Sequence, residues 1–297
     1  MRAKLQRIVA KAPEVMVKIT GKSKTVAHLK SHLEYITRNG ELAAETETGA
    51  VMQGRQGLRD VQARWADDAE LDGSRRRDGP LSHNIILSMP PGTDPMAVKD
   101  AVRAFAIGTF GDQHDYIFVQ HLDDEHPHVH LTVRSLGYDG RRLNPRKSDL
   151  ATWREEFAGK LRLRGVEAEA TPRRTRGKVR KAERGTVHAI KQRGEQPRVE
   201  RLAREEIVKE SRGGKRSDRP WNARTRERQA DVREAYRQQA EDLRRSASAA
   251  DRDLAMQVLQ FVAELPEVET RRDRLLKELA KAIQRIPPQE LGKNKDK

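Results

Sequence analysis

The 297-residue sequence contains no cysteine. This absence excludes disulfide scaffolds, thiolate metal sites, iron–sulfur clusters and cysteine nucleophiles. Aromatic residues make up only 4% of the chain, and the mean hydropathy is -0.88, because 35% of the residues are charged. No apolar run of about 18 residues occurs, and the basic N-terminus lacks a continuous apolar stretch, so we expect a cytoplasmic protein without membrane insertion. No G-x-x-x-x-G-K-[ST] phosphate loop is present, so ATP-driven unwinding is not encoded in this sequence.

Positive charge is concentrated in the second half of the chain. The formal net charge is +15, from 60 Lys and Arg against 45 Asp and Glu. Residues 171–297 hold 34 of the basic and 21 of the acidic side chains, whereas residues 1–170 are nearly balanced. Such a basic region favours a polyanionic partner. We predict a folded domain over 1–170, a basic and weakly structured arm over 171–220, and a helical C-terminal region over 221–297.

The spacing of apolar residues predicts the secondary structure. In the first half, strands are predicted at 15–20, 83–89, 115–121 and 128–134, and helices at 24–38, 55–68, 94–107 and 148–164. Residues 41–53 are ambiguous and allow a hairpin around Thr48 and Gly49. In the second half, helices are predicted at about 201–211, 222–247, 249–264 and 268–285. The chain is therefore predicted to be α+β, followed by a mainly helical region.

Four of the nine histidines lie in HLDDEHPHVH, residues 121–130. Alternate residues of a strand face the same side, so His128 and His130 share one face and the intervening aliphatic residues occupy the other. If the two strands that flank this segment pair, His121 lies opposite His128. Three neutral imidazoles then converge, an arrangement that suits a divalent metal with open coordination positions. The alternative is a polar hairpin with histidines on its surface.

Further polar residues occupy the turn between these strands. Asp123, Asp124 and Glu125 are placed to orient the histidine rings or to supply an oxygen to the site. His126 precedes a proline, and three roles stay open for it: a metal ligand, an outer contact of the metal site, or a residue that faces DNA.

A metal beside a basic arm suggests phosphodiester chemistry, which requires a nucleophile. No serine lies in a G-x-S-x-G context, and the chain has four tyrosines: Tyr35, Tyr116, Tyr138 and Tyr236. Tyr35 lies near the end of the helix predicted at 24–38. Tyr116 and Tyr138 flank the histidine segment, where sheet packing explains them equally well. A tyrosine that attacks a phosphate keeps the bond energy in a phosphotyrosine ester, so the reaction is reversible.

Three motifs together resemble the conjugative relaxases, a family of mobilisation nucleases in the HUH group. They are HLEYITRNG, HNIILSMPPG and HLDDEHPHVHLTV, and the resemblance extends over roughly residues 15–170. It implies an antiparallel, ferredoxin-like (HUH) sheet with the histidine strand central and helices on one side. By their place in these motifs, the corresponding residues are the nucleophile Tyr35, the metal ligands His121, His128 and His130, the supporting acid Asp123, which helps to activate the tyrosine, and Ser88, which holds DNA beside the scissile phosphate.

The resemblance implies a site-specific and strand-specific DNA endonuclease and strand transferase. Such an enzyme nicks one strand at an origin of transfer and keeps the 5′ end as a phosphotyrosine, with Mg²⁺ or Mn²⁺ as its metal. The implied partners are single-stranded origin DNA, relaxosome accessory proteins and the coupling protein of a type IV secretion system. The protein would be bacterial and cytoplasmic, and would enter the recipient with the DNA. We predict DNA contacts from Arg38 and, in the basic arm, from Arg173, Arg174 and Arg176.

Two other functions remain open. A rolling-circle replication initiator or transposase of the HUH group would place its tyrosine after the histidines, where Tyr236 is the candidate. A non-enzymatic, basic DNA-binding accessory protein would use the histidines as a structural metal site, which leaves Tyr35 without a role. The arm itself has the alternative of a solvated linker, and the pairing of residues 40–80 in the sheet stays open.

Overall fold

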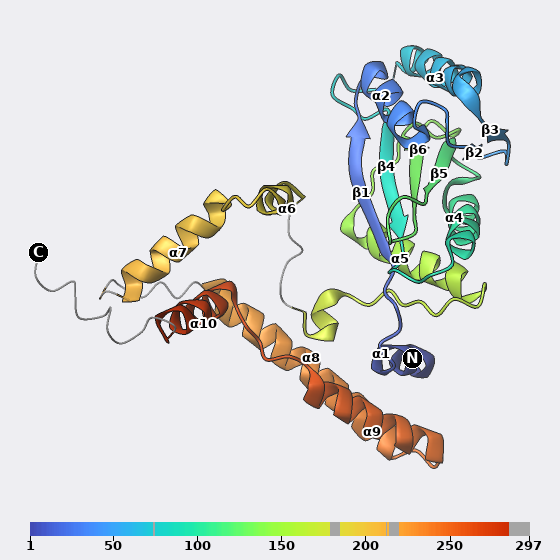
Figure 1. Cartoon of the computed structure of the whole chain (residues 1–297). Helices are drawn as coiled ribbons and strands as arrows, with labels where there is room; N and C mark the ends of the chain where they lie inside the picture. Colours follow the sequence, from blue (N-terminus) through green and yellow to red (C-terminus); the bar gives the residue numbers. More distant parts are fainter. Residues whose placement is uncertain (74, 179–184, 212, 214–219, 285–297) are drawn as a thin grey trace, which may run out of the picture. The chain divides into compact units, whose positions relative to one another are not determined.

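The computed structural model describes residues 1–73, 75–178, 185–211, 213 and 220–284. The chain divides into two compact units, Met1–Ala170 and Thr171–Lys297. The first combines a sheet with helices, and the second is mainly helical (Figure 1). The predicted α+β class and the helical character of the C-terminal region are therefore confirmed.

Six strands form one antiparallel sheet in the first unit. They are β1 (Met16–Ser23), β2 (Ala44–Thr46), β3 (Val51–Met52), β4 (Ser82–Ser88), β5 (Tyr116–His121) and β6 (His128–Arg134). Their order is β1-β4-β6-β5-β2-β3, which places the histidine-bearing β6 and β5 in the interior of the sheet. Strands β2 and β3 form the hairpin that the sequence allowed around Thr48 and Gly49.

Helices cover both faces of this sheet. Helices α4 (Pro95–Phe110) and α5 (Lys147–Arg162) pack on one face, where Phe105 and Phe157 meet Leu131 of β6. Helices α2 (Val26–Thr37) and α3 (Gly54–Leu71) pack on the other, where Leu33 and Trp65 meet residues of β5. The expectation of helices on one side was therefore wrong. The second layer arises because α2 and α3 each bury an apolar side against the same face of the sheet.

A sharp turn ends α2. Thr25 caps its start by accepting a hydrogen bond from the His28 amide, and Arg38, Asn39 and Gly40 beyond its end all have positive φ, at 50°, 57° and 89°. A Cβ on Gly40 would lie 2.6 Å from the carbonyl carbon of Gly54, so only glycine fits there. This turn fixes the end of α2 against the start of α3.

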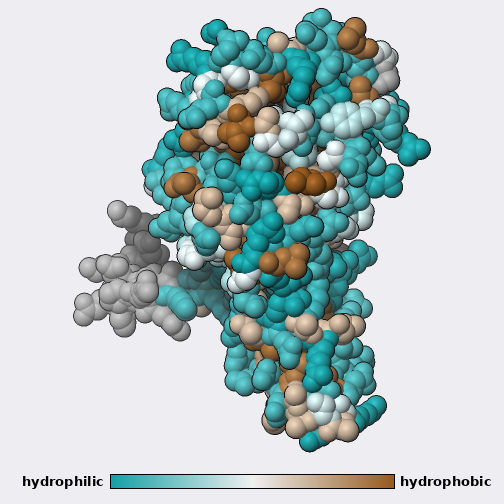
Figure 2. All heavy atoms as spheres, turned by 90° about the vertical axis from the view of Figure 1, so that its right-hand side faces the viewer, coloured by the Kyte–Doolittle hydropathy of each residue, from teal (hydrophilic) through white to brown (hydrophobic). Residues whose placement is uncertain are grey.

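The face of the molecule in Figure 2 is mainly hydrophilic, with hydrophobic residues in small separate patches. This surface agrees with the high proportion of charged residues. Among the described residues, no helix is long and apolar enough to cross a membrane.

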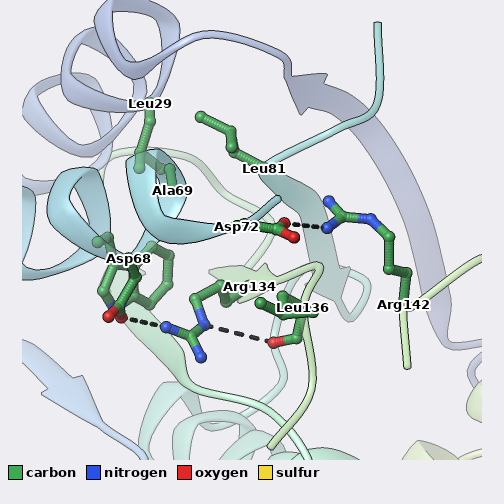
Figure 3. Close-up of a pocket in the computed structure, with 9 residues that line it drawn as sticks. Leu29, Asp68, Ala69, Asp72, Leu81, Arg134, Leu136 and Arg142 are labelled. Carbon is green, nitrogen blue, oxygen red and sulfur yellow. Dashed lines mark hydrogen bonds and ion pairs between the residues drawn. The ribbon is translucent and has the colours of Figure 1, made fainter. Parts of the chain in front are cut away.

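Ion pairs of two arginines hold the end of α3 against the sheet (Figure 3). Arg134 at the end of β6 pairs with Asp68 of α3, and its Nε lies 2.9 Å from Asp115 Oδ2. Arg142 pairs with Asp72, which follows α3, and also donates to a backbone carbonyl. These partly buried contacts hold the second helical layer on the histidine face of the sheet.

The N-terminal helix α1 (Arg2–Val9) completes the first unit, where Arg7 pairs with the buried Glu169. The second unit contains η1 (Arg173–Arg176), α6 (Gly185–Gln192), α7 (Arg198–Ser211), α8 (Pro220–Arg244), α9 (Ala249–Glu264) and α10 (Arg271–Gln284). Helices α8 and α9 pack together through residues such as Tyr236 and Phe261. The arm predicted to be weakly structured over 171–220 thus includes two helices, α6 and α7; its residues 179–184, 212 and 214–219 lie outside the described residues.

Candidate active site

Three histidines converge on the face of the sheet that α2 partly covers. His121 of β5 pairs directly with His128 of β6, and His130 lies two residues further along β6. The centroids of their rings lie 4.4 Å apart for His121 and His130, and 5.3 Å apart for the other two pairs. One potential ligand atom from each residue lies within 4.8 Å of the other two. The convergence predicted from strand pairing is therefore present.

Backbone carbonyls orient two of these rings. His121 Nε2 lies 2.7 Å from the carbonyl oxygen of Ile36 in α2, and His128 Nδ1 lies 2.9 Å from that of His126. A neutral imidazole that donates from one nitrogen keeps a lone pair on the other. The lone pair is then on Nδ1 of His121 and on Nε2 of His128, so both rings keep a nitrogen that can act as a ligand.

The electrostatics favour the neutral form that metal binding requires. Burial, and after it the neighbouring His121 and His128, lower the pKa of His130 to about 4. His130 is therefore neutral at pH 7 and its lone pair is available. His128 is only half-buried, which leaves one side of the cluster open. Within the described chain the cluster consists of three nitrogen donors, so a bound divalent ion would retain positions for other ligands.

Tyr35 lies beside this cluster and faces solvent. Its side chain on α2 is 67% exposed, and its ring lies edge-on to that of His130 with centroids 6.0 Å apart. Tyr116 is buried, and burial raises its pKa to about 12. Tyr138 donates to Asp115, and burial together with that carboxylate raises its pKa to about 12. Among the tyrosines of the first unit, only Tyr35 is both exposed and in ring contact with the histidines.

Tyr236, the candidate for a replication initiator, lies in the second unit. Its side chain is 8% exposed and packs edge-on against Phe261. A phenol in this position serves the packing of α8 against α9.

An ion pair joins the end of the tyrosine helix to the histidine turn. Arg38 Nη2 lies 2.5 Å from Asp123 Oδ2, and Asp123 Oδ1 lies 3.8 Å from His121 Nδ1. A backbone hydrogen bond and the charge of Arg38 hold the pKa of Asp123 below its usual value, so this carboxylate is anionic at neutral pH. Arg38, predicted to contact DNA, is engaged with Asp123 in this structure.

The remaining predicted residues differ in their relation to the cluster. Ser88 of β4 pairs directly with His128, so it shares the histidine face, and its hydroxyl lies 3.4 Å from the Met89 carbonyl. Glu125 and His126 are exposed in the turn, and His126 reaches the site through its carbonyl rather than its ring. Arg173, Arg174 and Arg176 lie in η1 of the second unit and are not part of this cluster.

His32 also lies at this site, although it was not among the site residues predicted from the sequence. It lies one turn before Tyr35 on α2, and its Nε2 is 3.0 Å from the hydroxyl oxygen of Thr132 on β6. Burial lowers the pKa of His32 to about 4, so this contact involves a neutral ring. The i, i+3 spacing from Tyr35 was the available signal, because it places both side chains on one helix face.

The region that holds this site is similar to a known family. Residues 35–160, which include Tyr35 and the three histidines, match the family model described as relaxase, MobA/VirD2-like, nuclease domain. Over these residues the first unit is similar to the MobA/VirD2-like relaxase nuclease domain. The match begins at Tyr35, near the end of α2, and spans the strands β2 to β6 and most of α5.

Curated relatives extend this likeness. The T-DNA border endonuclease VirD2 of Rhizobium radiobacter is 28% identical over 214 residues, which cover 65% of this chain and 48% of that protein. The protein of the same name from Agrobacterium fabrum is 26% identical over 184 residues, which cover 55% and 41%. The chain thus spans about half the length, or less, of these relatives.

One solved structure is similar to part of the chain. It is titled "Molecular Basis of Vancomycin Resistance Transfer in Staphylococcus aureus" and matches 54% of this chain and 99% of its own, at 15% identity and a TM-score of 0.35. A TM-score of this size supports no conclusion about function.

Proposed function

We propose that this chain is a DNA relaxase that nicks one strand at an origin of transfer through a tyrosine nucleophile. The observation that carries the proposal is the position of Tyr35, which is solvent-exposed and in edge-on contact with His130 of the histidine cluster. The similarity of residues 35–160 to a relaxase nuclease domain supports the same activity.

The proposed reaction is a transesterification at one phosphate. The Tyr35 oxygen loses its proton and attacks phosphorus, and the bond from phosphorus to the 3′ oxygen breaks. The leaving oxygen takes up a proton and becomes a 3′-hydroxyl, while the 5′ end stays on Tyr35 as a phosphotyrosine. A divalent ion held by the three histidines would neutralise charge on the non-bridging oxygens. The reverse reaction rejoins the strand without a cofactor such as ATP, because the ester keeps the bond energy.

The neighbouring residues have supporting roles in this proposal. The carboxylate of Asp123 lies 3.8 Å from His121 Nδ1, which suits it to hold the His121 side of the site and to assist the activation of Tyr35. Ser88, beside His128, would contact the DNA next to the scissile phosphate. Arg38 would contact the phosphate backbone from the end of α2. Glu125 and His126 would act from the turn, where the His126 carbonyl already contacts His128.

The wider role follows from the family and from charge. We propose single-stranded origin DNA as the substrate, with phosphate contacts from Arg173, Arg174 and Arg176 of the basic arm. We further propose relaxosome accessory proteins and a type IV coupling protein as partners in mobilisation. Nicking would occur in the bacterial cytoplasm, and the covalent protein would accompany the strand into the recipient. The relatives named as T-DNA border endonucleases support such a DNA-processing role.

The test uses single-stranded oligonucleotides that tile the DNA beside the gene, incubated with the full chain and Mn²⁺. We expect an adduct that survives SDS and heat in the wild type, none in Tyr35→Phe, and none in His128→Ala at the Mn²⁺ concentration that suffices for the wild type. Tyr138→Phe is the matched control, because Tyr138 is a half-exposed tyrosine outside the cluster. Its adduct should match that of the wild type. DNA binding without an adduct from any oligonucleotide would favour the non-enzymatic accessory protein instead.

A further inference from the structure

The histidine face of the sheet continues beyond the cluster onto β4 and β1. Two rows of paired residues cross β1, β4 and β6. The first row runs from Met16 through Ser88 to His128. The second row runs from Lys18 through Ile86 to His130. Directly paired residues of antiparallel strands point to the same face. Because neighbouring strands lie about 4.8 Å apart, Met16 and Lys18 lie roughly 10 Å across the sheet from the histidines.

The outer part of these two rows is not covered by the rest of the first unit. Met16 is 43% exposed, Lys18 is exposed, and Ile86 is the one residue of β4 that is not buried. Helix α2 crosses the face one row further along, where His32 contacts Thr132. Lys18 makes no ion pair with the described residues. The exposed Met16 and Lys18 and the half-buried Ile86 therefore form an accessible patch, called the β1 patch below.

We propose that the β1 patch binds the single-stranded DNA next to the cleaved phosphate. This inference rests on the proposed relaxase function and names a binding surface for its substrate. The Lys18 ammonium suits a backbone phosphate, and the apolar side chains of Met16 and Ile86 suit the faces of unpaired bases. The patch is continuous, through Ser88, with the histidines that would hold the scissile phosphate, so a bound strand passes from one to the other without leaving the sheet.

The same strand supplies a matched control. The pairing of β1 with β4 shifts between Ile19 and Gly21, so Lys22 pairs with His83 on the opposite face. Lys18 and Lys22 are both exposed lysines of β1 and carry the same charge. A general effect of net charge on DNA binding would involve both lysines equally, whereas the β1 patch involves only Lys18.

The experiment measures the affinity of the full chain for a labelled, mixed-sequence single strand of about 30 nucleotides. EDTA is present so that no cleavage occurs, and the salt concentration is varied. For Lys18→Gln we expect the negative slope of log affinity against log salt to become shallower by about 0.7. The ratio of the affinity at 0.1 M salt to the affinity at 1 M salt should then be about fivefold smaller than in the wild type. Lys22→Gln should match the wild type. Met16→Ser should weaken binding without a change of slope.

Equal effects of the two lysine variants, or no effect of either, would overturn the proposal. A Lys18→Gln variant that changes the sedimentation of the protein but not its DNA affinity would overturn it in favour of a protein partner on this face. Unchanged melting midpoints confirm that the variants are folded. The adduct assay keeps the two proposals separate. If the wild type forms the covalent adduct but the Lys18 and Lys22 variants bind DNA with the same affinity, only the β1 patch is rejected. If the wild type forms no adduct, the relaxase function itself is rejected.

Discussion

The ring of Tyr35 on α2 stands edge-on to the ring of His130 on β6, at 86° and 6.0 Å between centroids. These residues are 95 positions apart in the sequence, and their contact depends on how α2 docks on the sheet. Leu29, Leu33 and Ile36 bury one side of α2, which leaves Tyr35 exposed at the edge of the histidine cluster. The geometry of the proposed nucleophile is therefore set by helix packing as much as by the active-site residues.

The hydrogen bond between His32 and Thr132 should set this geometry. We expect His32→Leu to slow adduct formation at least about tenfold, because small displacements of a reacting group are costly, while metal and DNA affinity stay the same. His32→Gln should retain most of the rate, since its amide can reach the position of Nε2. Thr132→Val should lose as much as His32→Leu, and the double variant no more. Additive losses in this cycle would show that the two side chains act independently.

The donor set predicts a preference among metals. Three imidazole nitrogens bind Mn²⁺ better than Mg²⁺, which prefers oxygen ligands. We expect Mn²⁺ to support adduct formation at a concentration about tenfold or more below that of Mg²⁺, and His128→Ala to raise the concentration needed of either. Titration of each metal in the adduct assay measures this. Half-saturation by Mg²⁺ at the lower concentration, unaffected by His128→Ala, would contradict a histidine metal site.

The turn after α2 should be sensitive to any side chain at Gly40. Gly40→Ala combines a positive φ with a contact of 2.6 Å to backbone, whereas Gly49→Ala has a positive φ and open space. The positive φ alone should cost roughly 1 kcal/mol of unfolding free energy at either position. We expect Gly40→Ala to lose about 2 kcal/mol more than Gly49→Ala in urea denaturation. Equal losses of unfolding free energy in the two variants would contradict the close contact between Gly40 and the Gly54 backbone.

His83 should make the first unit sensitive to acid. Burial, and after it nearby positive groups, lower the pKa of His83 from 6.5 to about 4, so the folded state keeps it neutral while the unfolded state takes up a proton. Stability is therefore lost as the pH falls from about 6.5 to 4, by up to about 3 kcal/mol for this residue. His83→Asn keeps an amide near Nδ1, which bonds to Ser135, and removes the titration.

The comparison of urea denaturation at pH 7 and pH 4.5 checks this. The free energy of unfolding of His83→Asn should fall less between the two pH values than that of the wild type. Parallel losses in both proteins would place the acid sensitivity in other groups, such as His32.

Local patterns predicted much of the fold and the histidine cluster. The alternation in residues 128–134 gave the correct faces of β6, and the pairing of His121 with His128 followed from the short turn between β5 and β6. The second helical layer was not predicted, because the packing of Trp65 against β5 depends on contacts distant in sequence. The pairing of Arg38 with Asp123 and the contact of His32 with Thr132 were missed for the same reason.

The most direct test of the account is to locate the covalent link. The adduct formed with the cleaved oligonucleotide would be digested with protease and nuclease, and the modified peptide sequenced by mass spectrometry. We predict a residual 5′-linked nucleotide on Tyr35 and on no other tyrosine. A nucleotide on Tyr236 or Tyr138 would contradict the assignment of the nucleophile, and with it the proposed role of the contact between Tyr35 and His130.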